Sequence, residues 1–87
     1  MDNMDYIVTF YNHFGAVKFH RDLIKQNIFA KTMPVPRKLS SSCGTCVQFT
    51  ADKDISYFQP YLLPEEIEKI FSVQGEGQYQ LIKEYDD

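Results

Sequence analysis

The stretch Tyr6-Ile7-Val8-Thr9-Phe10-Tyr11 determines the fold that we expect, because the other elements are placed relative to it. It consists of β-branched and aromatic residues, with Thr9 as the one polar side chain among them. Residues of these types favour extended strands. Because the run is apolar on both of its faces, we expect a strand at the centre of a sheet that is covered on both sides.

A helix is predicted directly after this strand. Asn12 or His13 stands where a helix N-cap is required, and apolar side chains recur at helical spacing from Ala16 to Ile24. Asn27 can end the helix in the left-handed backbone conformation. Residues 28–33 then predict a second strand, parallel to the first strand and next to it, with the helix as the crossover.

The second half of the chain predicts two strands and a helix. Residues 46–51 alternate, and the alternation puts the Cys46 sulfur against the uncovered face of the sheet or against a partner. Residues 52–64 are too apolar for a bare loop and predict a packed excursion with one helical turn. Pro64 followed by two glutamates is typical of a helix start, and Ile67, Ile70 and Phe71 would form its buried stripe. Residues 78–85 predict the last strand.

This order of elements, β-α-β-β-α-β, indicates an α+β fold of the ferredoxin-like class. We expect one four-stranded antiparallel sheet with two helices on one face, and the first and third strands in its centre. A thioredoxin-like fold is the alternative, but its Cys-x-x-Cys motif opens a helix, whereas the pair in this chain precedes a strand. The 87 residues are expected to form one domain, residues 1–87.

Composition limits the classes of partner. The chain is 44% hydrophobic and 15% aromatic, which favours a packed globule over a disordered chain. A net charge of −3 gives no general attraction for nucleic acid or an anionic membrane. The apolar runs are too short to span a bilayer, and no signal peptide is evident, so we expect a cytoplasmic protein. We also expect neither a resident cofactor nor a metal ion.

The loop from Pro34 to Cys46 combines constrained backbone with reactive side chains. Pro34 and Pro36 should make the chain stiff, and Gly44 permits the positive φ of a tight turn. Cys43 and Cys46 bracket this turn at Cys-x-x-Cys spacing. Two cysteines so close together cannot staple a domain, so they indicate redox or metal chemistry.

Charged and hydroxyl side chains in the same loop could assist a thiolate. Arg37 and Lys38 lie just upstream of Cys43, and a nearby positive charge favours the thiolate over the thiol. Ser42 offers a hydroxyl next to it. Cys43 lies on the serine-rich side of the turn and closer to the basic pair, so we predict that Cys43, and not Cys46, is the reactive thiol.

The Pro34-x-Pro36-Arg37, Ser42, Cys43-Gly44 pattern, after an apolar strand and a helix, resembles the DUF3343 family of small bacterial proteins. These proteins are described as selenium/sulfur carrier-like. The similarity covers roughly residues 1–50. It implies that Cys43 holds a persulfide or selenopersulfide, and that the partners are proteins that donate and accept sulfur or selenium.

Other interpretations of the two cysteines remain open. They could be small structural residues at a strand start, or a dithiol-disulfide pair. Structural zinc normally takes four protein ligands, so a second copy or a histidine would have to complete a site. The domain could instead be a non-enzymatic protein-interaction module that uses its aromatic side chains. No nucleophile elbow or phosphate loop is present, so we expect a carrier or accessory protein and not an autonomous enzyme.

A homodimer is a further expectation from the sequence. The second and fourth strands of the predicted sheet would be edges with unpaired backbone groups. Seven phenylalanines and six tyrosines are also more than one small core readily buries. Pairing through an edge or an aromatic patch would satisfy both.

Overall fold

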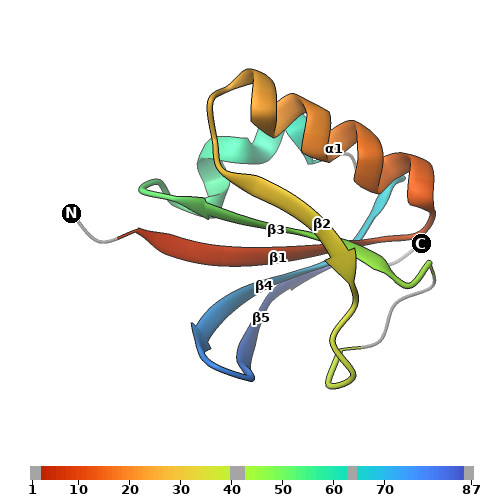
Figure 1. Cartoon of the computed structure of the whole chain (residues 1–87), viewed down its shortest axis with the longest axis vertical. Coiled ribbons are helices and arrows are strands. Elements are labelled where there is room, and N and C mark those ends of the chain that lie inside the picture. Colours follow the sequence, from red (N-terminus) through yellow and green to blue (C-terminus); the bar gives the residue numbers. More distant parts are fainter. Residues whose placement is uncertain (1–2, 40–42, 63–64, 86–87) are drawn as a thin grey trace.

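The protein folds around one five-stranded antiparallel sheet. The computed structural model describes residues 3–39, 43–62 and 65–85. The strands lie in the order β2-β3-β1-β4-β5, and helix α1 crosses one face (Figure 1). The elements in chain order are β1 (Met4–Phe10), α1 (His13–Lys25), β2 (Ala30–Pro34), β3 (Thr45–Ala51), the 3-10 helix η1 (Ile55–Tyr61), β4 (Ile67–Gly75) and β5 (Gln78–Glu84).

The first strand is central, as predicted. β1 pairs antiparallel with β3 on one side and with β4 on the other. The predicted helix ends are also confirmed. The Asn12 side chain accepts a hydrogen bond from the Gly15 N–H at 2.9 Å, and Asn27 has a φ of +62°. Since both ends of α1 have local signals, the sequence defines this helix well.

The ferredoxin-like prediction is wrong. The described residues contain one α-helix, and the segment predicted as a second helix forms strand β4 instead. Pro64, its expected first residue, lies outside the described residues. The spacing of Ile67, Ile70 and Phe71 fits a helical stripe, but it also fits a strand that is buried on both faces. β4 turns back into β5 at Gly77, which has a φ of +70°, and this hairpin supplies a fifth strand.

The predicted parallel pairing of the first two strands is also wrong. β3 lies between β1 and β2 and is antiparallel to both. The crossover through α1 therefore places β2 one strand away from β1, and β3 fills the position between them. The excursion after β3 does contain the predicted helical turn, as the 3-10 helix η1, and Phe58 and Leu62 from it are buried.

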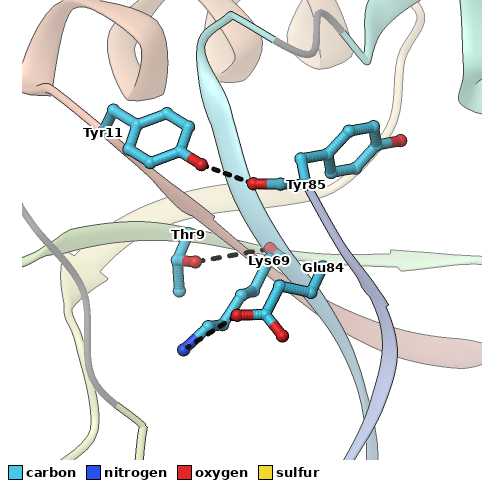
Figure 2. A network of polar contacts seen from close by, with 5 residues as sticks. All are labelled: Thr9, Tyr11, Lys69, Glu84 and Tyr85. Carbon is cyan, nitrogen blue, oxygen red and sulfur yellow. Dashed lines mark hydrogen bonds and ion pairs between the residues drawn. The ribbon is translucent and has the colours of Figure 1, made fainter. Parts of the chain in front are cut away.

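A group of polar contacts fastens the β4–β5 hairpin to β1 (Figure 2). The Tyr11 hydroxyl donates to the Tyr85 carbonyl, and Thr9 Oγ1 donates to the Lys69 carbonyl at 3.4 Å. Lys69 Nζ lies 4.0 Å from Glu84 Oε2 on the neighbouring strand. These contacts join three strands at one end of the sheet, in addition to the backbone pairing of β4 with β1 and β5.

The sheet has two faces that are covered differently. The helix-covered face carries alternate residues of β1, including Tyr6, Val8 and Phe10, packed under α1 and η1. Phe49 lies in the middle of this core, with ring centroids 5.3, 5.8 and 5.0 Å from those of Tyr6, Phe19 and Phe58. The other face, called the open face below, has no helix across it among the described residues (Figure 1). Its buried side chains are Ile7, Cys46 and Phe71, with Met33, Val35, Leu39, Val73 and Tyr79 packed against them.

Candidate functional site

The loop between β2 and β3 is an ordered continuation of these strands on both sides of residues 40–42. The Val35 N–H donates to the Gly44 carbonyl at 3.0 Å, which extends the pairing of the two strands by one step. The Leu39 N–H donates to the Pro36 carbonyl at 2.9 Å and closes a turn. These two bonds hold residues 35–39 and the position of Gly44, directly after Cys43.

Gly44 adopts the positive φ that the sequence predicts, at +75°. A Cβ atom at this position would meet nothing within 4 Å, so a lack of room is not the reason that glycine is required here. The backbone conformation is the reason, because L side chains rarely adopt a positive φ. Gly44 therefore sets the direction in which the chain leaves Cys43 and enters β3.

Cys43 is half-buried and contacts the backbone two residues further on. Its Sγ donates to the Thr45 carbonyl at 3.2 Å and accepts from the Thr45 N–H at 3.4 Å. A thiolate would keep the N–H contact and lose the contact in which it donates. One backbone donor is thus already directed at the Cys43 sulfur. The sulfur packs against the core of the helix-covered face.

Cys46 has a different environment, as the alternation of β3 predicts. It is fully buried in the cluster on the open face, paired with Met33 of β2 and Thr9 of β1. Its Sγ donates to the Pro34 carbonyl at 3.8 Å. Burial raises the pKa of the Cys46 thiol to about 11, with a charge on Cys43 as a second cause. Cys46 is therefore a thiol at neutral pH.

The two cysteines contact opposite faces of the sheet. Cys43 packs against the core on the helix-covered face, whereas Cys46 belongs to the cluster on the open face. Cysteines whose Cβ atoms point apart cannot form a disulfide unless the backbone moves. In this conformation the Cys-x-x-Cys motif presents two separate thiols, and both are free.

The other predicted site residues lie in different places. Lys38 Nζ donates to the Gly77 carbonyl in the β4–β5 turn at 2.8 Å. Arg37 is exposed, and no hydrogen bond or ion pair within residues 3–39, 43–62 and 65–85 joins it to Cys43. Ser42 lies outside the described residues. The role of these three residues in stabilising a Cys43 thiolate stays a prediction.

Sequence reasoning missed the residues that surround the two sulfurs. Thr45 provides the backbone contacts of Cys43, and Met33, Val35 and Leu39 help to cover Cys46. The alternation of β3 could have identified Met33, since it lies directly opposite Cys46 once β2 and β3 are paired. No sequence signal indicates that Val35 and Leu39 fold onto the open face.

The described residues contain neither a cluster of metal ligands nor a helix that could span a membrane. Within them, no three His, Cys, Asp or Glu side chains lie together in a way that could hold a metal ion. In the same part of the chain, no helix is both long and apolar enough to span a membrane.

A comparison with protein families gives a match. The family model described as "Putative Se/S carrier protein-like" matches residues 5–69, from β1 into β4. The chain belongs to this family. The matched residues include the whole loop from Pro34 to Cys46, and therefore both thiols. Neither a curated protein nor a solved structure matches the chain.

Proposed function

We propose that this protein accepts sulfur or selenium on Cys43, as a persulfide or selenopersulfide, and passes it to an acceptor protein. Membership of the Se/S carrier-like family supports the class of cargo. The observation that carries the choice of residue is the difference in burial between the two thiols. Cys46 is 0% exposed, whereas Cys43 is half-buried at a turn and can be reached by a partner.

The transfer is an exchange at sulfur that needs no external oxidant. The Cys43 thiolate attacks the outer sulfur of a donor persulfide, an S–S bond forms at Cys43, and the donor leaves as a thiolate. An acceptor thiolate then takes the outer sulfur from Cys43 by the same step. The Thr45 N–H, which already contacts the Cys43 sulfur, is placed to stabilise the Cys43 thiolate that attacks in the first step and leaves in the second.

The loop provides further groups for this chemistry in our proposal. Gly44 sets the turn that presents Cys43, Arg37 and Lys38 supply positive charge, and Ser42 supplies a hydroxyl. Donor and acceptor are cytoplasmic proteins that dock around the loop. A homodimer would use the outer edge of β2 or of β5, the two edges of the sheet.

The test is the intact mass of the protein after incubation with inorganic polysulfide, before and after a reductant. We expect the wild type and Cys46→Ser to gain sulfur that the reductant removes, and we expect Cys43→Ser not to gain it. Uptake by Cys43→Ser that equals uptake by the wild type would reassign the site to Cys46. No uptake by any of the three would remove the chemical basis of the carrier proposal.

An interaction module is the second candidate function, and exposed aromatic side chains favour it. Phe29 is 73% exposed and Tyr57 is 51% exposed, and both line a hollow of about 390 Å³ at the end of β3. Lys53 Nζ lies 5.1 Å from the centroid of the Tyr57 ring. This surface contains neither cysteine. If the carrier test fails, loss of a partner in Phe29→Ser but not in Cys43→Ser would support the module.

A further inference from the structure

A second thiol close to a persulfide is a chemical hazard for a carrier. A thiolate at Cys46 could attack the inner sulfur of a Cys43 persulfide. The Cys43–Cys46 disulfide would form, the bond to the outer sulfur would break, and the outer sulfur would leave as hydrosulfide with the proton that Cys46 gave up. Cys46 would be oxidised and the cargo sulfur reduced. The cargo would be lost as hydrogen sulfide before it reached an acceptor.

The structure keeps Cys46 away from this reaction in two ways. First, strand pairing on both sides of Cys46, with Thr9 and Met33, directs its side chain to the face opposite that of Cys43. Second, the sulfur is fully buried between Ile7 and Phe71 of the sheet and the side chains packed onto them. Attack would require the start of β3 to separate from its neighbours and turn over.

The segment Val35–Leu39, called the cover below, closes the open face over this cluster. Its two ends, Val35 and Leu39, both pack against the Cys46 cluster. Between them, Lys38 donates to the Gly77 carbonyl at 2.8 Å. This bond ties the cover, which follows β2 at one edge of the sheet, to the turn between β4 and β5 near the other edge. Gly77 holds its own turn with a φ of +70° and so presents that carbonyl in a fixed direction.

The Gly77 end of this tie borders a hollow part of the face. A depression of about 460 Å³ lies along the open face and is lined by residues of β1, β3, β4 and the β4–β5 turn, among them Gly77. Lys38 is exposed, so water competes with its hydrogen bond to Gly77. The bond therefore contributes only modestly to the stability of the closed cover. A contact of this kind suits a cover that holds at rest and can be released.

We propose that the cover, tied by Lys38 to Gly77, keeps Cys46 from resolving a Cys43 persulfide, so that the protein delivers its sulfur instead of releasing it as hydrogen sulfide. This inference rests on the proposed carrier function. It makes Cys46 a protected residue whose separation from Cys43 preserves the cargo. Release of the cover would remove one of the two restraints on Cys46 and would raise the rate at which the protein discharges sulfide.

The experiment compares sulfide release after loading with inorganic polysulfide and removal of the excess. The variants are Cys46→Ser, Lys38→Met and the double variant of both. Lys31→Met is the matched control, because it removes an exposed lysine from the adjoining strand β2 without touching the Gly77 tie. Unfolding midpoints confirm that each variant is folded.

We expect the wild type, Cys46→Ser and Lys31→Met to hold the persulfide equally long. Lys38→Met should release sulfide roughly three- to tenfold faster, the effect of losing one hydrogen bond that keeps the cover closed. Intact mass should show the intramolecular disulfide as its product. The double variant should return to the wild-type rate. Faster release from the wild type than from Cys46→Ser would overturn the inference, and so would acceleration by Lys38→Met that persists without Cys46.

A second measurement separates failure of this inference from failure of the carrier function. In the Cys43→Ser background without any cargo, iodoacetamide should label Cys46 slowly, and Lys38→Met should raise that rate by a similar factor while Lys31→Met should not. Equal labelling rates in all three would refute the cover even if Cys43 loads sulfur. Absence of loading with the expected labelling pattern would refute the carrier function alone.

Discussion

The two faces of the sheet are closed by different kinds of structure. The helix-covered face is closed by α1 and η1, whose aromatic side chains interdigitate with those of β1 and β3. The open face is closed by the cover, by the hydrogen bond from Lys38 to Gly77 and by a few partly buried apolar side chains. The first closure includes Cys43 at its margin, whereas the second lies over Cys46. The two thiols are thus enclosed by different kinds of structure on opposite faces of one sheet.

Removing the ring of Phe49 should have the largest effect. Phe49 contacts three other rings and is 0% exposed, so Phe49→Ala is expected to cost about 3–5 kcal/mol of unfolding free energy. The corresponding change on the open face, Phe71→Ala, should cost less, because Phe71 is 8% exposed and is less completely buried than Phe49. Urea unfolding of both variants measures the difference. An equal or larger loss for Phe71→Ala would show that the open face contributes at least as much to the unfolding free energy as the helix-covered face.

Alkaline pH should weaken the open face through Cys46. The pKa of Cys46 rises from 9.0 to about 11 on burial, so the folded state keeps the thiol proton at a pH where the unfolded chain has lost it. The stabilisation is therefore complete below about pH 9 and is lost as the pH rises toward 11. The loss approaches about 1.4 kcal/mol per pH unit at most.

The control for this prediction is Cys46→Ala. Burial also raises the pKa of Tyr6 and Tyr85, so both tyrosines contribute to any alkaline loss of stability in either protein. The difference in unfolding free energy between the wild type and Cys46→Ala should shrink between pH 8 and pH 10.5. A difference that stays constant would mean that the Cys46 sulfur is reached by water.

The turn at Gly44 should be sensitive to backbone conformation and insensitive to size. Gly44→Ala is expected to cost about 1–2 kcal/mol, because alanine is strained at a φ of +75° although the space is open. Gly44→Asn is the matched variant, since asparagine tolerates the left-handed conformation better, and it should lose less in thermal unfolding. If the larger asparagine costs more than alanine, packing and not φ determines this position.

The ion pair between Lys69 and Glu84 should contribute least. The two side chains are 22% and 47% exposed and are 4.0 Å apart, so Glu84→Gln is expected to change the unfolding free energy by less than about 0.5 kcal/mol. Raising the salt concentration should affect the wild type and the variant almost equally. A loss above about 1 kcal/mol would indicate that the open face depends on charge pairs more than on its apolar cluster.

The sequence predicts the first part of the fold because its signals are local. Asn12 caps a helix, Asn27 ends it, and the alternation of residues 46–51 orients β3. Residues 67–75 lack such a decisive signal. Ile67, Ile70 and Phe71 suit a helix or a doubly buried strand, and the choice depends on pairing with β1, which is more than 50 residues away in the chain.

The candidate site was predictable to a similar extent. The motif identifies both cysteines, and alternation places Cys46 on the uncovered face, as the structure confirms. The basic residues were interpreted from their closeness in sequence to Cys43. In the structure Lys38 extends toward Gly77, a contact between residues 39 positions apart that no local pattern encodes. Side-chain direction in a loop depends on what the fold places beside it.

The position of β1 has a consequence for the time course of folding. Asp5 pairs with Thr50 on one side and with Val73 on the other, so the central strand is synthesised before both of its neighbours and is completed late. Nearly the whole domain must leave the ribosome before β1 acquires both neighbours. Sheets built from such distant pairings fold in milliseconds to seconds and not in microseconds. Until β4 arrives, the apolar run at residues 6–11 stays available to chaperones and to aggregation.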